Sequence, residues 1–164
     1  MTDPISSPEA PVANVVLYRP EIPPNTGNIG RSCVAVGAKL WIVGPTGFDL
    51  SDSRVRRAGL DYWQHLDLEE IDRWDDVVPQ LPRERTFFFT THAERSLWDL
   101  PLQRGDGFVF GPESVGLPRD IVTPDHPNAI GIPIDGKVRS LNLATTVGIV
   151  LFEQQRQLLQ GSTR

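Results

Sequence analysis

Residues 132–153 read IPIDGKVRSLNLATTVGIVLFE, and this stretch decides the fold expected for the C-terminal half of the chain. It starts within a short apolar strand, residues 129–133, and passes through a polar turn into a long helix. Ser140 is the predicted N-cap of that helix, because its hydroxyl can accept a hydrogen bond from a first-turn amide.

The predicted helix is apolar on more than one side. Two rows of apolar or small residues follow helical spacing: Leu141, Ala144, Gly148 and Leu151, then Leu143, Val147 and Val150. A helix that is apolar nearly all round is buried on most of its sides. We therefore predict that one side packs on a sheet and the other side packs on a second subunit.

Strands and helices alternate along the rest of the chain. The apolar runs predict strands at residues 14–18, 40–44, 86–91 and 108–111. Helices are predicted at residues 26–36, with Asn25 as N-cap, and at residues 51–57 and 67–78. This alternation predicts an α/β fold with a mostly parallel sheet and helices on both faces.

Length and composition narrow the class of protein. A chain of 164 residues is one domain by length, predicted here at residues 14–160, after a disordered tail at residues 1–13 that is rich in Pro and Ser. The single cysteine, Cys33, excludes an internal disulfide. The sequence contains neither a signal peptide nor an apolar run that could span a bilayer. We therefore expect a cytoplasmic protein without a membrane anchor.

The net charge of −5 argues mildly against nucleic-acid binding, because phosphate contacts need Lys and Arg. Exposed charges more than a Debye length apart, about 8 Å, are largely screened from one another. A local cluster of arginines can therefore still bind RNA on an acidic protein. The densest cluster is Arg54, Arg56 and Arg57, and a solvated helix face is the alternative interpretation of it.

Three sequence motifs occur in the order typical of one enzyme class. The first is NTGNIGR at residues 25–31, the second is FGPESVG at residues 110–116, and the third is the stretch at residues 132–153. The chain resembles the SPOUT-class RNA 2′-O-methyltransferases over about residues 15–158. Residues 17–24, LYRPEIPP, and residues 56–62, RRAGLDY, are similar to the small tRNA wobble-nucleotide 2′-O-methyltransferases.

The resemblance implies a C-terminal trefoil knot, a homodimer and S-adenosylmethionine as the cofactor, without a metal. The cofactor contacts that it implies fall at five positions: Phe89, Thr90, Gly111, Ile132 and Ser140. Each position also has a plainer interpretation, such as a turn glycine for Gly111, a core residue for Ile132 and a helix cap for Ser140. Asn142 adds a polar group beside Ser140.

The resemblance also implies an activating role for Arg31 toward the ribose 2′-hydroxyl. A guanidinium is always protonated at neutral pH, so Arg31 could instead hold a phosphate and align the hydroxyl. Asn28 is predicted to share the helix face of Arg31, and both are grouped with Asn142 and Glu113 as the candidate catalytic residues. Glu113 is either a second polar group of the site or a carboxylate favoured at a helix start.

The predicted function is methyl transfer from S-adenosylmethionine to the wobble ribose, the cytidine or uridine at position 34 of tRNA. Arg54, Arg56, Arg57 and Arg139 are the candidate RNA contacts, and the four tryptophans are assigned to the core or to an interface. Phe152 stands where many relatives have tyrosine. Two alternatives remain: the same chemistry on another tRNA position or on rRNA, and a non-catalytic protein that binds RNA or the cofactor.

Overall fold

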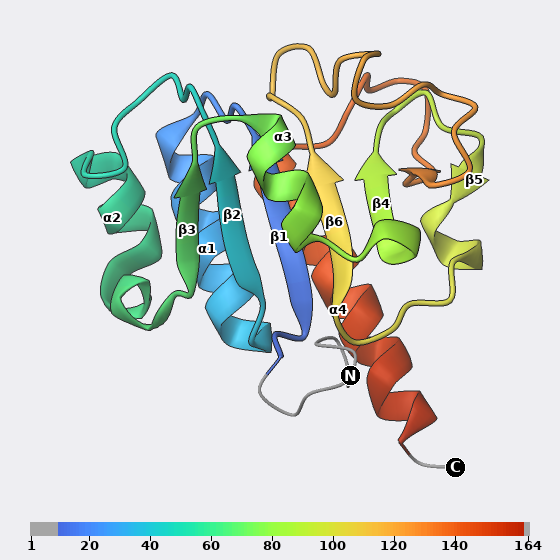
Figure 1. Ribbon diagram of the computed structural model, residues 1–164, viewed down its shortest axis with the longest axis horizontal. Helices are drawn as coiled ribbons and strands as arrows, with labels where there is room; N and C mark the ends of the chain where they lie inside the picture. Colours follow the sequence, from blue (N-terminus) through green and yellow to red (C-terminus); the bar gives the residue numbers. More distant parts are fainter. Residues whose placement is uncertain (1–9, 163–164) are drawn as a thin grey trace.

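The computed structural model describes residues 10–162, apart from the side chains of residues 58–60. Seven strands form one sheet in the order β3-β2-β1-β6-β4-β7-β5, and every strand pair is parallel (Figure 1). The strands are β1 (Ala13–Tyr18), β2 (Lys39–Val43), β3 (Leu68–Ile71), β4 (Thr86–Phe89), β5 (Arg95–Ser96), β6 (Asp106–Phe110) and β7 (Ala129–Gly131). The predicted α/β class with a parallel sheet is confirmed.

Helices cover both faces of the sheet. The helices are α1 (Pro23–Val36), α2 (Ser53–Gly59), α3 (Trp74–Val77) and α4 (Leu143–Gly161). Short 3₁₀ turns lie at η2 (Leu60–His65), η3 (Val78–Gln80), η4 (Arg83–Arg85) and η5 (Leu97–Asp99). Helices α1 and α4 lie behind the sheet in Figure 1, and α3 lies in front of it.

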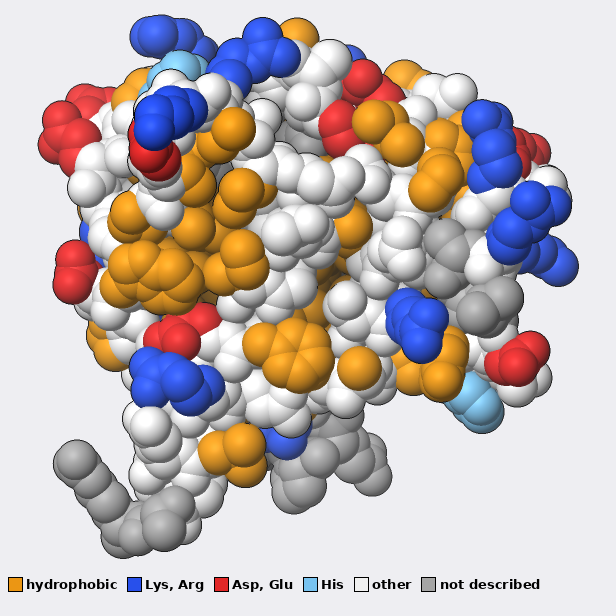
Figure 2. All heavy atoms as spheres, turned by 180° about the vertical axis from the view of Figure 1, so that it is seen from behind, with side chains coloured by type: hydrophobic (Ala, Val, Ile, Leu, Met, Phe, Trp, Pro, Cys, Tyr) orange, Lys and Arg blue, Asp and Glu red, His pale blue; other side chains and the backbone are white. Residues whose placement is uncertain are grey.

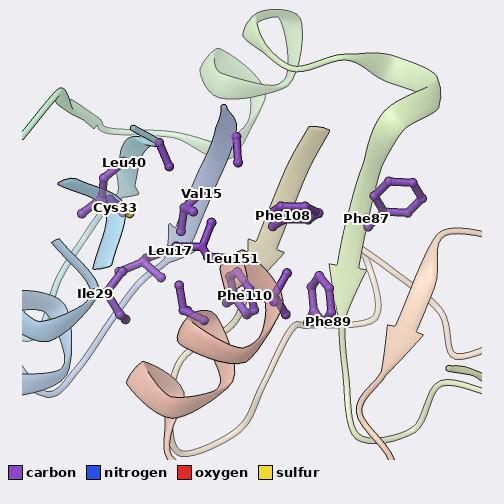
Figure 3. Close-up of a cluster of buried hydrophobic side chains, with 14 of the residues drawn as sticks. Val15, Leu17, Ile29, Cys33, Leu40, Phe87, Phe89, Phe108, Phe110 and Leu151 are labelled. Carbon is purple, nitrogen blue, oxygen red and sulfur yellow. The ribbon is translucent and has the colours of Figure 1, made fainter. Parts of the chain in front are cut away.

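The core divides into two layers because alternate strand residues point to opposite faces. On the α1 and α4 side, Val15 and Leu17 pack with the aromatic residues of β4 and β6 that face the same way (Figure 3). On the α3 side, Val16 packs with Trp41 and Val77. Strand β1 is therefore buried on both faces, as strands of parallel sheets usually are.

Both predicted N-caps are wrong. Helix α4 begins at Leu143, and the side chain of Asn142, not that of Ser140, accepts the bond from the Thr145 amide at 3.2 Å. Helix α1 begins at Pro23 after Ile22, because the Pro23–Pro24 pair fits the first turn of a helix, where free amides are not needed. Asn25 is consequently a buried residue of the first turn.

The single helix predicted at residues 67–78 is also wrong. The segment forms β3 and the one-turn helix α3 instead. The first half pairs with β2, with Leu40 opposite Leu68 and Val43 opposite Ile71. Pairing with the edge of the sheet satisfies backbone groups of both strands, and it overrides the helical spacing of Ile71, Trp74 and Val78. Strand β5 was not predicted.

The N-terminal tail was predicted at residues 1–13. Residues 1–9 of it lie outside the described residues, and β1 starts at Ala13. The knotted path of the C-terminal segment stays a prediction. Within residues 10–162, no helix is both long and apolar enough to cross a membrane.

Candidate active site

A cavity of about 480 Å³ opens at the carboxyl ends of β4, β6 and β7, where parallel α/β sheets place their ligands. Its lining residues are Ile22, Asn25, residues 89–92, residues 110–117, Ile130, Ile132, Ile134, residues 139–143 and Thr146. All five positions expected to contact the cofactor are among them. They come from three separate strand ends and from the segment before α4.

Gly111 allows the loop after β6 to fold back on itself. A Cβ atom built at Gly111 would lie 2.3 Å from the backbone carbon of Gly116 and 2.3 Å from the amide nitrogen of Leu117. Gly116 has a φ of 70°, a left-handed conformation that favours glycine. The Gly116 amide donates to the Pro112 carbonyl at 2.9 Å. These contacts fix one wall of the cavity.

The carboxylate of Glu113 holds the start of α1. One oxygen accepts from the Glu21 amide at 2.8 Å, and the other accepts from the Ile22 amide at 3.1 Å. Ile22, the N-cap of α1, supplies no side-chain cap of its own. A carboxylate at this point pairs with free amides and with the positive end of the helix dipole. Glu113 is thus a carboxylate at a helix start, and that helix is α1, which lies far from Glu113 in the sequence.

A short chain of amide side chains links all three motifs. The side-chain Nδ2 of Asn25 donates to the Glu113 carboxylate at 3.3 Å. The side-chain oxygen of Asn25 accepts from Nδ2 of Asn142 at 3.0 Å. Asn25 is only 7% exposed, although it lines the cavity. Sequence reasoning treated Asn25 as a cap, although its place at the head of the first motif was a signal for a site residue.

Three further polar residues line the same cavity. Ser140 and Arg139 are exposed on the segment that precedes α4. His92, which lies outside the three motifs, also lines the cavity. Its amide donates to the Thr90 hydroxyl at 3.3 Å. The cavity therefore contains hydrogen-bonding groups of several kinds around apolar walls.

Arg31 and Asn28 lie apart from the cavity. Both side chains are exposed on α1, and within residues 10–162 neither belongs to the cavity lining. The Arg31 guanidinium carbon lies 4.9 Å from the centre of the Tyr62 ring, a cation–π distance. Within one chain, the structure therefore brings together the cofactor positions with Glu113 and Asn142, and it leaves Arg31 and Asn28 outside.

The three arginines of α2 differ in their pairing. Arg54 forms a 2.8 Å ion pair with Asp52, and the hydrogen bonds from Arg54 hold the pKa of the Asp52 carboxyl below its usual value. Arg56 and Arg57 are exposed, and in the described part of the chain neither forms an ion pair. Arg56 and Arg57 are therefore freer than Arg54 to contact a phosphate.

Comparison with known proteins identifies the family. Residues 13–152 match the SpoU rRNA Methylase family. The chain belongs to this family. A tRNA (cytidine(34)-2′-O)-methyltransferase of Methylovorus glucosotrophus is 42% identical over 88% of this chain and 94% of that protein. A protein of the same name from Burkholderia cenocepacia is 45% identical, again over 88% of this chain and 94% of its own length.

Solved structures of the family have the same fold. One, described as giving structural insights into the 2-OH methylation of C/U34 on tRNA, is 43% identical with a TM-score of 0.86, over 92% of this chain and 98% of its own. An AdoMet-bound rRNA methyltransferase from Sinorhizobium meliloti is 25% identical with a TM-score of 0.76, over 89% of this chain and 56% of its own. The resemblance stated from the motifs is confirmed.

Metal ligands do not cluster in the part of the chain that the structure describes. Within residues 10–162, no group of three or more His, Cys, Asp or Glu side chains could hold a metal ion.

The one cysteine, Cys33, is buried in the core, where burial raises the pKa of its thiol far above the usual value.

Proposed function

We propose that this protein is a tRNA 2′-O-methyltransferase that uses S-adenosylmethionine to methylate the wobble ribose, cytidine or uridine 34. The observation that carries the proposal is the meeting of the three motifs around one cavity, through Asn25, Glu113 and Asn142. Relatives that are 42% and 45% identical over 88% of the chain carry the name tRNA (cytidine(34)-2′-O)-methyltransferase.

The cavity suits S-adenosylmethionine in size and in chemistry. Its volume of about 480 Å³ lies in the range of small-molecule sites, which run from about 300 to 1,000 Å³. Ile130, Ile132 and Leu117 provide apolar walls for a flat adenine ring, and strand-end backbone groups provide donors and acceptors. Phe89, Thr90, Gly111, Ile132 and Ser140 would hold the cofactor.

The bound cofactor supplies an electrophilic methyl group. When transferred to the ribose 2′-oxygen, that group would leave S-adenosylhomocysteine as the product, and the hydroxyl proton would be released to water. Protein groups contribute chiefly by alignment, which can account for much of the rate. Arg31 is assigned to the phosphate next to the target ribose, with Asn28 on the same exposed face of α1.

A second copy of the chain is the proposed partner of α4. The outer face of α4 carries Gly148, where an added Cβ would meet nothing within 4 Å, and Phe152, which is 54% exposed. Leu159, further along α4, is 65% exposed. Figure 2 views the molecule from the side on which α4 lies and shows apolar side chains gathered in patches there. Pairing two copies along this face would cover them.

The proposed RNA surface uses the arginines that the fold leaves exposed. Figure 2 shows Lys and Arg side chains gathered at its right edge, the side on which α2 lies. Arg57 and Arg56 are assigned to phosphate contacts there, and Arg139 at the cavity mouth is assigned to the target nucleotide. Because such an enzyme works where tRNA is found, the cytoplasmic location stays part of the proposal.

Mass-spectrometric mapping of 2′-O-methyl groups tests the proposal. We expect the modification at position 34 of some tRNAs to vanish in cells that lack the gene and to return with the wild-type gene. Loss of a methyl group elsewhere in tRNA or in rRNA would point to the same chemistry on another target. An unchanged methylation map, together with purified protein that binds tRNA but transfers nothing, would make it a binding protein.

Arg31 is tested by two substitutions. Arg31→Ala should remove most single-turnover methyl transfer at saturating tRNA while cofactor binding persists, because alignment of the ribose is lost. Arg31→Lys keeps the charge but loses the planar fork, so it should also lose most activity. A Lys variant with a near-normal rate would mean that charge alone suffices. Arg83→Ala, another exposed arginine outside the motifs, is the matched control.

A further inference from the structure

A second hollow, of about 320 Å³, lies at the junction of α2 and η2. Among the side chains that the structure describes, Arg56, Asp61, Trp63 and Gln64 line it, and none of them lines the larger cavity. One aromatic ring, one guanidinium, one carboxylate and one amide thus converge on a single concave surface. The proposed function leaves Asp61, Trp63 and Gln64 without a role.

Packing against α1 fixes the Trp63 ring. A Cβ atom built at Gly30 would lie 2.9 Å from Cζ3 and 3.3 Å from Cε3 of Trp63, so α1 comes close to the ring only because residue 30 is glycine. Trp63 is nevertheless half-buried and lines the hollow. A ring held in place on one side and accessible on the other is a ready stacking platform. The assignment of this tryptophan to the core describes only its packed side.

The polar groups of the hollow are not neutralised by one another. Arg56 and Asp61 are both exposed, and in residues 10–162 neither takes part in an ion pair. Nearby, Arg54 is bound to Asp52 by a nitrogen–oxygen contact of 2.8 Å. Arg56 can therefore contact an incoming phosphate, and the carboxylate of Asp61 can accept hydrogen bonds from a ligand.

We propose that this hollow binds one unpaired nucleotide of the substrate RNA. The base stacks on Trp63, its edge meets Asp61 and Gln64, and its phosphate meets Arg56. Proteins recognise single-stranded RNA in this way, by stacking bases on aromatic rings and bonding to their edges. The proposal rests on the proposed function for the choice of RNA as ligand.

The chemistry of the hollow also predicts which bases it prefers. A carboxylate accepts hydrogen bonds and donates none, so Asp61 favours a base that carries an exocyclic amino group. Adenine, cytosine and guanine have such a group. The one donor on the pairing edge of uracil, N3–H, lies between two carbonyl oxygens that repel a carboxylate. Within one chain the hollow shares no described lining residue with the cofactor cavity, so we assign it to a nucleotide other than the methylated one.

The test uses full-length protein and a hairpin RNA that copies the anticodon arm of a substrate tRNA. Loop nucleotides are replaced one at a time by abasic residues, and affinity is measured by fluorescence anisotropy. Wild-type protein should lose about 10-fold in affinity at one loop position, the scale of one base–aromatic stack. Trp63→Leu should bind the intact hairpin about 10-fold more weakly than wild-type protein does. The abasic residue at that position should then cause no further loss of affinity.

Asp61 and Arg56 are exposed, so substitutions there test the proposal without disturbing the packing of the protein. Asp61→Asn should narrow the preference for an amino-bearing base over uracil at that position by about 5-fold, since an amide presents a donor as well as an acceptor. Arg56→Ala should lower the slope of log affinity against log salt by about 0.7, the value for one single-strand phosphate contact. Arg83→Ala is the control for a lost surface charge.

The outcomes distinguish a failure of the nucleotide-subsite proposal from a failure of the proposed methyltransferase function. If Asp61→Asn keeps the wild-type base preference and Arg56→Ala keeps the wild-type salt slope, the hollow is not a nucleotide subsite, whether or not Trp63→Leu folds. Calorimetry should give unchanged S-adenosylmethionine binding for all three variants. Absence of methyl transfer by wild-type protein that still reads the abasic position would overturn the proposed function and leave the subsite standing.

Discussion

At the scale of single residues, the site depends on contacts between distant parts of the chain. Glu113 reaches the amides of Glu21 and Ile22, and Asn142 reaches Asn25. Neither hydrogen-bonded contact involves an atom that reacts. Both instead fix the wall of the cavity relative to the first turn of α1, the helix that carries Arg31. We therefore assign Glu113 and Asn142 to positioning, where sequence reasoning grouped them with the catalytic residues.

Glu113→Gln tests that assignment. The substitution keeps the shape but replaces one acceptor oxygen by a donor, so one amide at the start of α1 loses its partner. We expect a loss of about 1–2 kcal/mol, which is roughly 3–6 °C in melting temperature. Methyl transfer should fall further than cofactor affinity does. Rescue of the rate by Glu113→Asp would support positioning, and Glu94→Gln, at an exposed position, serves as the control.

Gly111→Ala tests the close approach of two backbone segments. The new methyl group would overlap the backbone at Gly116 and Leu117, which cannot rotate away as a side chain would. We expect destabilisation of about 1–3 kcal/mol and at least a 10-fold loss in S-adenosylmethionine affinity by calorimetry. Gly136→Ala is the matched control, because nothing lies within 4 Å of an added Cβ there. Equal behaviour of the two variants would remove Gly111 from the site.

At the scale of elements, local pattern predicted most of the fold but misplaced its junctions. Strand β1 and the long helix α4 were predictable, because their apolar periodicity agrees with how they pack. Strand β3 was not, since Leu68–Ile71 becomes a strand only by pairing with β2. The three motifs could be recognised in the sequence. The bond between Asn25 and Asn142 could not be predicted, because it joins residues that only the folded sheet brings together.

Helix α4 carries the prediction about assembly. Gly148→Arg places a long charged side chain on its outer face, where the chain itself leaves open space. The monomer should therefore tolerate the change, and arginine is a better helix former than glycine. We expect light scattering to show a monomer for Gly148→Arg and a dimer for wild-type protein. Circular dichroism should give the same spectrum for both.

Gly161→Arg is the control for this experiment, because Gly161 lies on the same helix, at its C-terminal end, and is equally open. It should stay dimeric. A folded Gly148→Arg dimer would place the interface on another face of the molecule.

At the scale of the whole molecule, one buried ion pair ties the end of η4 to the start of β6. The Asp106 carboxylate is 1% exposed and accepts from the Arg85 guanidinium at 2.7 and 2.8 Å. Burial raises the pKa of Asp106, and the hydrogen bonds from Arg85 oppose that rise. Without the guanidinium, the pKa in the folded state would rise further above the value in the unfolded chain.

Arg85→Leu should therefore destabilise the protein in a pH-dependent way. Below the pKa of the unfolded chain, about 3.9, the carboxyl is protonated in both states and the loss is small. As pH rises through the raised folded pKa, the free energy of unfolding should fall, by about 3 kcal/mol near pH 7. Urea unfolding at several pH values measures this. Arg73→Leu breaks an exposed pair and should show little dependence on pH.

The place of β1 inside the sheet, between β2 and β6, also has a consequence for synthesis of the protein. Asn14 pairs with Lys39 on one side and with Gly107 on the other. While the chain is being made, β2 emerges soon after β1, but β6 follows much later. At a synthesis rate of about 5–20 residues per second, β1 keeps an open edge beside its apolar side chains for several seconds on the ribosome. Such an edge is a template for wrong pairing, so the nascent chain is a natural client for a ribosome-bound chaperone.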